Sequence, residues 1–151
     1  MAECGIFGVY GFKNVAFSID GSLVTNFDEG DDCITIEPTS DLGTPKVGAD
    51  GGSILSITAD QSATVTIRLL PNSPMNRFLE NKVKRMRSGA LTGTTFAIGF
   101  TDLSSTETGG CTQAIVMREP TTTRGVNANN LEWAFFCPCW QKGIVQVNSA
   151  A

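Results

Sequence analysis

The segment from Gly48 to Gly89 constrains the possible folds of this chain more than any other part of it. It opens with a glycine-rich turn, continues with two stretches in which apolar and polar residues alternate, and ends in an amphipathic pattern. A period of two is typical of half-buried strands, whereas apolar residues three and four positions apart indicate a helix. No catalytic group is recognisable here beyond scattered carboxylates, so we interpret the segment as elements that pack and assemble.

A helix is expected over residues 74–88. Ser73 is a favourable N-cap, and Pro74 suits the first helical position because its missing N–H is not needed there. Gly89 can adopt the positive φ that ends many helices. Five apolar side chains fall on one face: Met75, Phe78, Leu79, Val83 and Met86. Five basic side chains occupy the remaining surface: Arg77, Lys82, Lys84, Arg85 and Arg87.

Short alternating stretches elsewhere predict a mainly β protein. About nine strands are expected, at 6–12, 15–19, 33–37, 54–58, 64–70, 96–101, 112–119, 131–137 and 144–147. The first two face each other across Lys13–Asn14, which makes a tight hairpin plausible. Many short strands separated by turns indicate a β-sandwich or partial barrel, here with one flanking helix in a single domain over residues 1–151.

Two segments fall outside this pattern of strands. Residues 38–53 are rich in Gly, Pro, Ser and Thr, and we expect them to form a long extended loop. Loops of that length in compact domains are usually functional or mobile. Residues 138–151 are expected to form a C-terminal extension. On the strand before it, alternate residues that include Trp133 and Phe135 are expected to face the core.

The chemistry available to the chain argues against an enzyme. It contains no histidine, which removes the commonest general base and the commonest transition-metal ligand. The acidic turn at 28–32 lacks the spacing of a calcium loop. Cys137 and Cys139 supply two thiolates, which do not complete a four-ligand zinc site. We therefore predict no catalytic residue, no metal and no cofactor.

Targeting signals are also not apparent. No apolar run approaches the length of a membrane span, and no basic start is followed by an apolar stretch. The cysteines are odd in number and irregularly spaced, which is a poor disulfide framework. They are Cys4, Cys33, Cys111, Cys137 and Cys139. We expect synthesis and residence in a reducing cytoplasm, without a membrane.

Charge is distributed unevenly along the chain. Residues 1–60 contain 2 basic and 10 acidic side chains, a net charge of −8, whereas residues 61–151 have a net charge of +4. Oppositely charged surfaces can attract copies of one subunit head to tail, and two solvated surfaces are the equal alternative. The basic helix is also a candidate for phosphate contact. Its cations lack interleaved aromatic residues, which favours a solvated face or one that meets an acidic partner copy.

Four segments stand out together: the GADG turn at 48–51, the strand SATVTIRLL at 62–70, the helix start SPMN at 73–76 and NNLEWAF at 129–135. In this order they resemble segments of bacteriophage tail tube proteins from long-tailed phages. The likeness covers roughly residues 6–137. It implies a β-sandwich or partial barrel flanked by one helix. It also implies a structural virion protein, in which six copies form a ring and stacked rings form the tube for DNA ejection.

The resemblance further implies where the chain resides and what it meets. The expected partners are other copies of itself and the sheath, tail terminator, baseplate or tail-tip and tape-measure proteins. DNA would pass without specific binding, and the tail would assemble in the host cytoplasm. An acidic lumen or interface is expected from Asp20, Asp28, Glu29, Asp31 and Asp32. The loop at 38–53 is the candidate arm to the next ring, with Asp41, Lys46 and Asp50.

Two other functions remain open at this point. The first alternative is a monomeric β-barrel module that binds a small ligand, and the second is a cysteine- or carboxylate-based enzyme. A binding module requires an enclosed pocket in a soluble monomer. A tube protein instead requires two different surfaces that contact other copies of the same chain.

Overall fold

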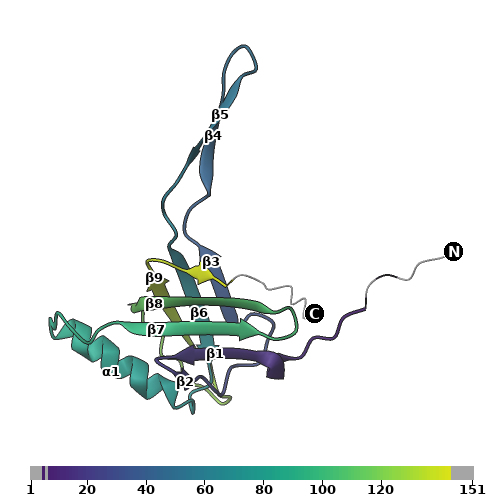
Figure 1. Cartoon of the computed structure of the whole chain (residues 1–151). Coiled ribbons are helices and arrows are strands. Elements are labelled where there is room, and N and C mark those ends of the chain that lie inside the picture. The colour runs from purple at the N-terminus through teal and green to yellow at the C-terminus, as the bar shows by residue number, and fades with distance from the viewer. Residues whose placement is uncertain (1–4, 6, 144–151) are drawn as a thin grey trace.

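The computed structural model describes residue 5 and residues 7–143, and it confirms a mainly β chain with one flanking helix (Figure 1). A 3-10 turn, η1 (Phe12–Asn14), precedes the first strand. The strands are β1 (Val15–Ile19), β2 (Ser22–Leu23), β3 (Ile34–Pro38), β4 (Gly43–Val47), β5 (Ser53–Ile57), β6 (Ala63–Leu69), β7 (Phe96–Asp102), β8 (Glu107–Arg118), β9 (Leu131–Cys137) and β10 (Gln141–Lys142). The helix is α1 (Met75–Arg87).

Most strands belong to one antiparallel sheet with the order β2-β1-β7-β8-β9-β6-β3, and β10 pairs with β8. The sheet has two halves, β2-β1-β7 and β9-β6-β3, and β8 is long enough to pair with both of them. Its residues 107–114 pair with β7, and residues from Ile115 to Arg118 pair with β9. Register shifts mark both ladders, as expected of bulges, which bend and twist a strand. The two halves therefore fold toward each other around one core.

Alternation along the strands determines which side chains enter that core. In β6 every second residue from Ala63 to Leu69 is buried, and β9 buries Trp133 and Phe135 in the same way. The face predicted for β9 is thus confirmed. The rings of Phe96 and Phe135 pack edge to face, with centroids 5.2 Å apart. Strand β1 closes the other side of the core with Phe17 and Ile19.

Helix α1 packs against this core through the face that its period predicts. Leu79 is fully buried, and the buried side chain of Asn76 accepts a hydrogen bond of 3.0 Å from the indole Nε1 of Trp133. Gly89 has φ +82°, which confirms the expected helix end. The expected cap is wrong, because the hydroxyl of Ser73 donates to the carbonyl of Thr25 (2.7 Å) and not to the helix. A tertiary contact therefore replaces the local one.

The expected strand at 6–12 and its hairpin are also wrong over the described residues. Residues 7–11 have no strand partner, and Phe12–Asn14 forms a 3-10 turn. Strand β1 instead pairs with β2 and with β7, so residues 7–11 find no free edge of β1 to pair with. The strand expected at 144–147 and most of the extension at 138–151 lie outside the described residues.

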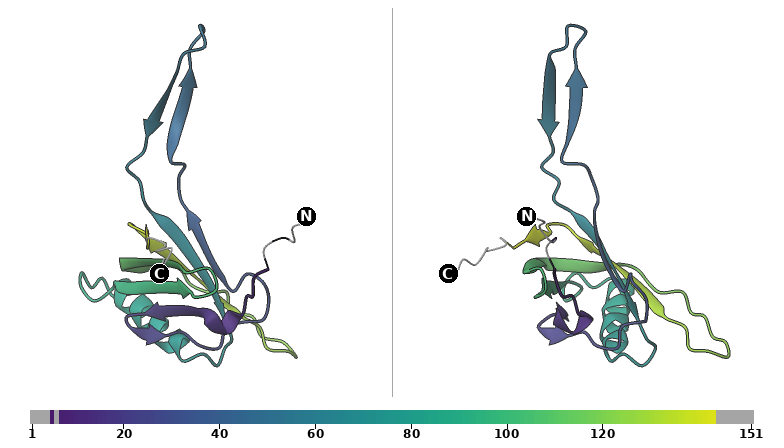
Figure 2. Two further views of the ribbon diagram at one scale, coloured as in Figure 1. Left: turned by 45° about the vertical axis from the view of Figure 1, so that its right-hand side comes forward. Right: turned by 90° about the vertical axis from the view of Figure 1, so that its right-hand side faces the viewer.

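The segment at 38–53 is not the loop that its composition predicts. It contains β4, which pairs with β5 over five residue pairs from Gly43–Ile57 to Val47–Ser53. We call residues 43–57 the arm. Figures 1 and 2 show the arm projecting away from the body of the molecule, beyond the ends of β3 and β6.

Candidate functional site

The arm is closed by a tight turn in the Gly48–Gly52 segment. The amide of Gly48 donates to the carbonyl of Gly52 (2.6 Å), and the amide of Gly52 donates to Asp50 Oδ1 (3.2 Å). Gly51 has φ +92°, a conformation that residues with a Cβ rarely adopt. The turn predicted from the GADG sequence is therefore present, and it fixes the register of the two strands.

The two faces of the arm differ in chemistry. Residues directly opposite one another on antiparallel strands share a face, so one face carries only apolar side chains and Ser53. These apolar residues are Pro45, Val47, Leu55 and Ile57. Val47 is 70 % exposed and Ile57 is 81 % exposed, so this face is uncovered in the single chain. The other face carries Lys46 and Ile54.

A network of hydroxyl and carboxylate groups fixes the base of the arm. Asp60 accepts hydrogen bonds from the hydroxyls of Ser40 (3.0 Å) and Ser62 (2.6 Å) and from the amide of Ser62 (2.9 Å). These bonds lower the pKa of Asp60, with the contacts to Ser62 contributing most. Thr39 and Ser62 are joined through their hydroxyls. The network therefore links the segment before the arm to the segment after it.

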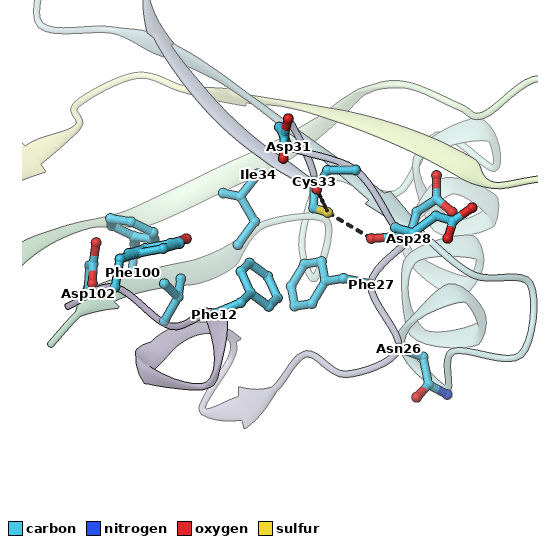
Figure 3. Close-up of a pocket in the computed structure, with 13 residues that line it drawn as sticks. Phe12, Asn26, Phe27, Asp28, Asp31, Cys33, Ile34, Phe100 and Asp102 are labelled. Carbon is cyan, nitrogen blue, oxygen red and sulfur yellow. Dashed lines mark hydrogen bonds between the residues drawn. The ribbon is translucent and has the colours of Figure 1, made fainter. Parts of the chain in front are cut away.

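A cavity of about 660 Å³ lies at the start of β3 (Figure 3). Apolar and acidic side chains share its lining, and we call it the acidic cavity. Its lining comprises Tyr10, Phe12, Val15, Asn26, Phe27, Asp28, Glu29, Gly30, Asp31, Cys33, Ile34, Phe100 and Asp102. The rings of Phe12 and Phe27 meet edge to face with centroids 5.5 Å apart. This arrangement presents an aromatic surface bordered by carboxylates.

The acidic residues named from the sequence do not all lie together. Asp28, Glu29 and Asp31 line the acidic cavity, and Asp32 is the neighbouring residue of the same turn. Asp20 instead follows the opposite end of β1, where its carboxylate accepts the amide of Ala97 (2.9 Å). Its φ of +51° shows a tight turn at that point. The structure therefore separates Asp20 from the other four.

Within the turn, the carboxylates have different partners. Asp32 is paired with Arg68, which also contacts Glu132 at 3.2 Å, and Asp28 accepts the amide of Asn130 (2.7 Å). Glu29 and Asp31 are exposed, and they make no side-chain hydrogen bond or ion pair within residues 5 and 7–143. They are therefore available to an external cation.

The basic helix surface is only partly available to a partner. Lys82 donates to the carbonyls of Gly93 (3.1 Å) and Thr95 (3.3 Å), and Arg85 Nε donates to that of Thr92 (2.7 Å). Arg87 pairs with Glu119 (2.6 Å). Arg77 and Lys84 are exposed and make no such contact in the described part of the chain. These last two are therefore the cations left to attract a partner.

The cysteines do not converge on a metal site in the described residues, where no group of three or more His, Cys, Asp or Glu side chains could hold an ion. Cys139 is exposed, and Cys4 lies outside the described range. Cys137 is buried, and that burial together with the neighbouring Cys111 thiol raises the pKa of Cys137 to about 12. Across the same described residues, no helix is sufficiently long and apolar to span a membrane.

Sequence reasoning missed two parts of these surfaces. The first is the aromatic lining of the acidic cavity, because Phe12, Phe27 and Phe100 come from three distant segments. The second is the apolar face of the arm, because residues 54–57 were expected to lie in a half-buried strand. Ile54 and Leu55 are adjacent, so one must point away from any single core, and this break in alternation was the available signal.

Comparison with known proteins agrees with this architecture. The family model for the bacteriophage PhiTE tail tube protein matches residues 7–144. A search of curated proteins by sequence finds no match. Among solved structures, a sheath/tube terminator of the extracellular contractile injection system PVC, in the extended state, has a TM-score of 0.60 at 12 % identity. That alignment covers 95 % of this chain and 99 % of the other.

Two further structures have a similar fold. The anti-feeding prophage cap (AFP tube terminating cap) gives a TM-score of 0.55 at 8 % identity over 94 % of this chain and 95 % of its own. A chain of the PVC sheath–tube complex in the extended state gives 0.56 at 13 % identity, over 89 % and 91 % respectively. Identities this low show likeness of fold alone, whereas the family model spans most of the sequence. This chain belongs to the bacteriophage PhiTE tail tube protein family, and it is a structural protein of the phage tail, not an enzyme.

Proposed function

We propose that the whole chain acts as one domain that forms hexameric rings, and that these rings stack into the tail tube through which DNA is ejected. The observation that carries this proposal is the arm. An isolated two-stranded hairpin is marginally stable in water, and this one also exposes an apolar face. Contact with another copy would cover that face and order the hairpin. A monomeric ligand-binding module leaves it unexplained.

The sheet supplies a second reason for self-association. Within the described residues, β3 pairs on one side only, with β6, and it lies at an end of the strand order. An unpaired edge is a site of aggregation unless another strand or element covers it. Lateral pairing around a ring would satisfy such edges, while the arm makes a different contact along the axis. Two unlike self-contacts of this kind give closed rings and an open stack.

We further propose that an acidic lumen lets DNA pass without specific binding. Residues 1–60, with a net charge of −8, would supply the negative charge of the lumen. Negative charge repels the phosphate backbone, so DNA would not bind there. In this proposal the chain resides in the tail of the virion, after assembly in the host cytoplasm. Sheath, tail terminator, baseplate or tail-tip and tape-measure proteins are the proposed further partners. Arg77 and Lys84 offer a basic surface for one of them or for a neighbouring copy.

Removal of the arm tests this function. The amide of Thr58 donates to the carbonyl of Leu42 (3.0 Å), so residues 43–57 can be replaced by an Asn-Gly turn without stretching the base. We expect the variant to fold, as judged by circular dichroism and urea unfolding, but to form no sedimenting tubes. Val126→Ser alters an exposed apolar side chain outside the arm, and it should leave tubes unchanged. Normal tubes from the armless variant would contradict the proposal.

A further inference from the structure

The arm and the acidic cavity lie at opposite ends of one strand. The side chain of Ile34, at the start of β3, lines the cavity, whereas Pro38 ends β3 on the way to the arm. Four residue steps at about 3.3 Å each separate these ends by roughly 13 Å. Figure 1 shows the arm continuing away from the body beyond the end of β3. Copies stacked in one orientation therefore direct the arm of each toward the cavity end of the next.

The two surfaces are also matched in their apolar chemistry. The arm presents Val47 and Leu55 on its apolar face, both more than half exposed. The cavity of about 660 Å³ presents Phe12, Phe27 and Phe100, which come from three segments of the chain. Aliphatic side chains placed against aromatic rings would remove both surfaces from water, which is the main source of stability in such contacts.

Charge complementarity favours the same pairing. Lys46 is the sole cation between residues 39 and 62 of the sequence, and it lies on the distal half of the arm, on the face opposite Val47 and Leu55. The acid of the arm, Asp50, already accepts the amide of Gly52 within the turn (3.2 Å). Glu29 and Asp31 border the cavity, and within the described chain neither makes a side-chain hydrogen bond or ion pair. An incoming ammonium group would therefore find free carboxylates at the rim.

We propose that the arm of one copy seats in the acidic cavity of the next, with Val47 and Leu55 against the aromatic lining and Lys46 paired with Glu29 or Asp31. This inference rests on the proposed function, because it requires that copies assemble. It adds the receptor surface for the arm, and it assigns two of the acidic residues to a contact between copies, not to a lumen.

A charge exchange tests the pairing. Lys46→Glu should raise the concentration needed for tube formation at least tenfold, and so should the double variant Glu29→Lys/Asp31→Lys. Combining all three changes should bring the concentration needed for tube formation back to within about threefold of that of the unchanged protein. Glu80→Lys/Glu107→Lys makes an equal charge change at exposed acids elsewhere, and it should not rescue Lys46→Glu. Rescue by that control pair would show a general charge effect and would overturn the proposal.

Cross-linking between two variants tests the geometry without relying on charge. In a Cys4→Ser/Cys139→Ser background, a Lys46→Cys copy mixed with an Asp31→Cys copy should form a disulfide-linked pair under mild oxidation. Val126→Cys in place of Lys46→Cys should give none. If instead Val9→Cys links to Asp31→Cys within one chain of an assembled tube, the N-terminal segment fills the cavity and the proposal is wrong.

These outcomes are separable from failure of the proposed function. Tubes formed by the armless variant would refute the function itself. Loss of tubes in that variant, with neither rescue by charge exchange nor cross-linking, would leave the function standing and would overturn only the assignment of the acidic cavity.

Discussion

The hydrogen bond between Asn76 and Trp133 provides a quantitative test of how the helix is held. Asn76 accepts from the indole of Trp133 (3.0 Å), and its own amide donates to the carbonyl of Leu70 (3.0 Å). Trp133 is 1 % exposed, so water cannot replace the lost acceptor in Asn76→Ala. An unsatisfied buried donor costs about 1–3 kcal/mol, and a lost neutral hydrogen bond about 1 kcal/mol. In the same variant the carbonyl of Leu70 still accepts the amide of Ser73 (3.0 Å), so this carbonyl does not lose its last hydrogen bond.

We therefore expect Asn76→Ala to lower the free energy of unfolding by about 2–4 kcal/mol. In a domain of this size each kcal/mol lowers Tm by about 2–4 °C. Urea unfolding followed by tryptophan fluorescence, under conditions that keep the protein monomeric, measures the change. Asn81→Ala is the matched control, because Asn81 is exposed on the same helix and should change stability by less than about 0.5 kcal/mol. If both variants unfold at the same urea concentration, the helix is not held in this way.

Three further outcomes follow from other parts of the structure. Leu79→Ala should lower the free energy of unfolding by about 2–5 kcal/mol, because the side chain is fully buried; a smaller loss in urea unfolding would contradict the packing of α1. Gly89→Ala should cost about 1 kcal/mol because its φ is +82°, whereas Gly125→Ala, with no positive φ, should be nearly neutral. The raised pKa of Cys137, about 12, means that the folded state holds its proton more tightly than the unfolded chain. Stability should therefore fall as pH rises from 9 toward 12, and pH-dependent unfolding of Cys137→Ala should show a shallower fall. An identical slope would refute this cause.

Much of the fold could be predicted because local patterns and tertiary packing agree there. Residues 131–137 form β9 at the predicted bounds, since Trp133 and Phe135 alternate with less buried residues. The helix is similarly clear from its apolar period and from Gly89. In such segments the apolar side chains all fall on one face, so the local pattern alone predicts which face is buried.

The remaining features depend on contacts between distant segments, which local patterns do not contain. Residues 7–12 carry a strand pattern, but β1 takes its partners from β2 and β7, so the segment has no strand to pair with in the described chain. Ser73 is a good local cap, yet its hydroxyl bonds Thr25, 48 positions away in the sequence. The composition of 38–53 indicates a loop, although pairing with β5 makes part of it a strand. The acidic cavity likewise gathers residues from several segments.

The most direct test of the central claim is electron microscopy of the purified protein, with its mass in solution measured on the same sample. The account predicts hollow tubes or rings with six-fold symmetry, and density from each arm in contact with the adjacent ring. A uniform 16.0 kDa monomer at high concentration, with neither rings nor tubes, would contradict it.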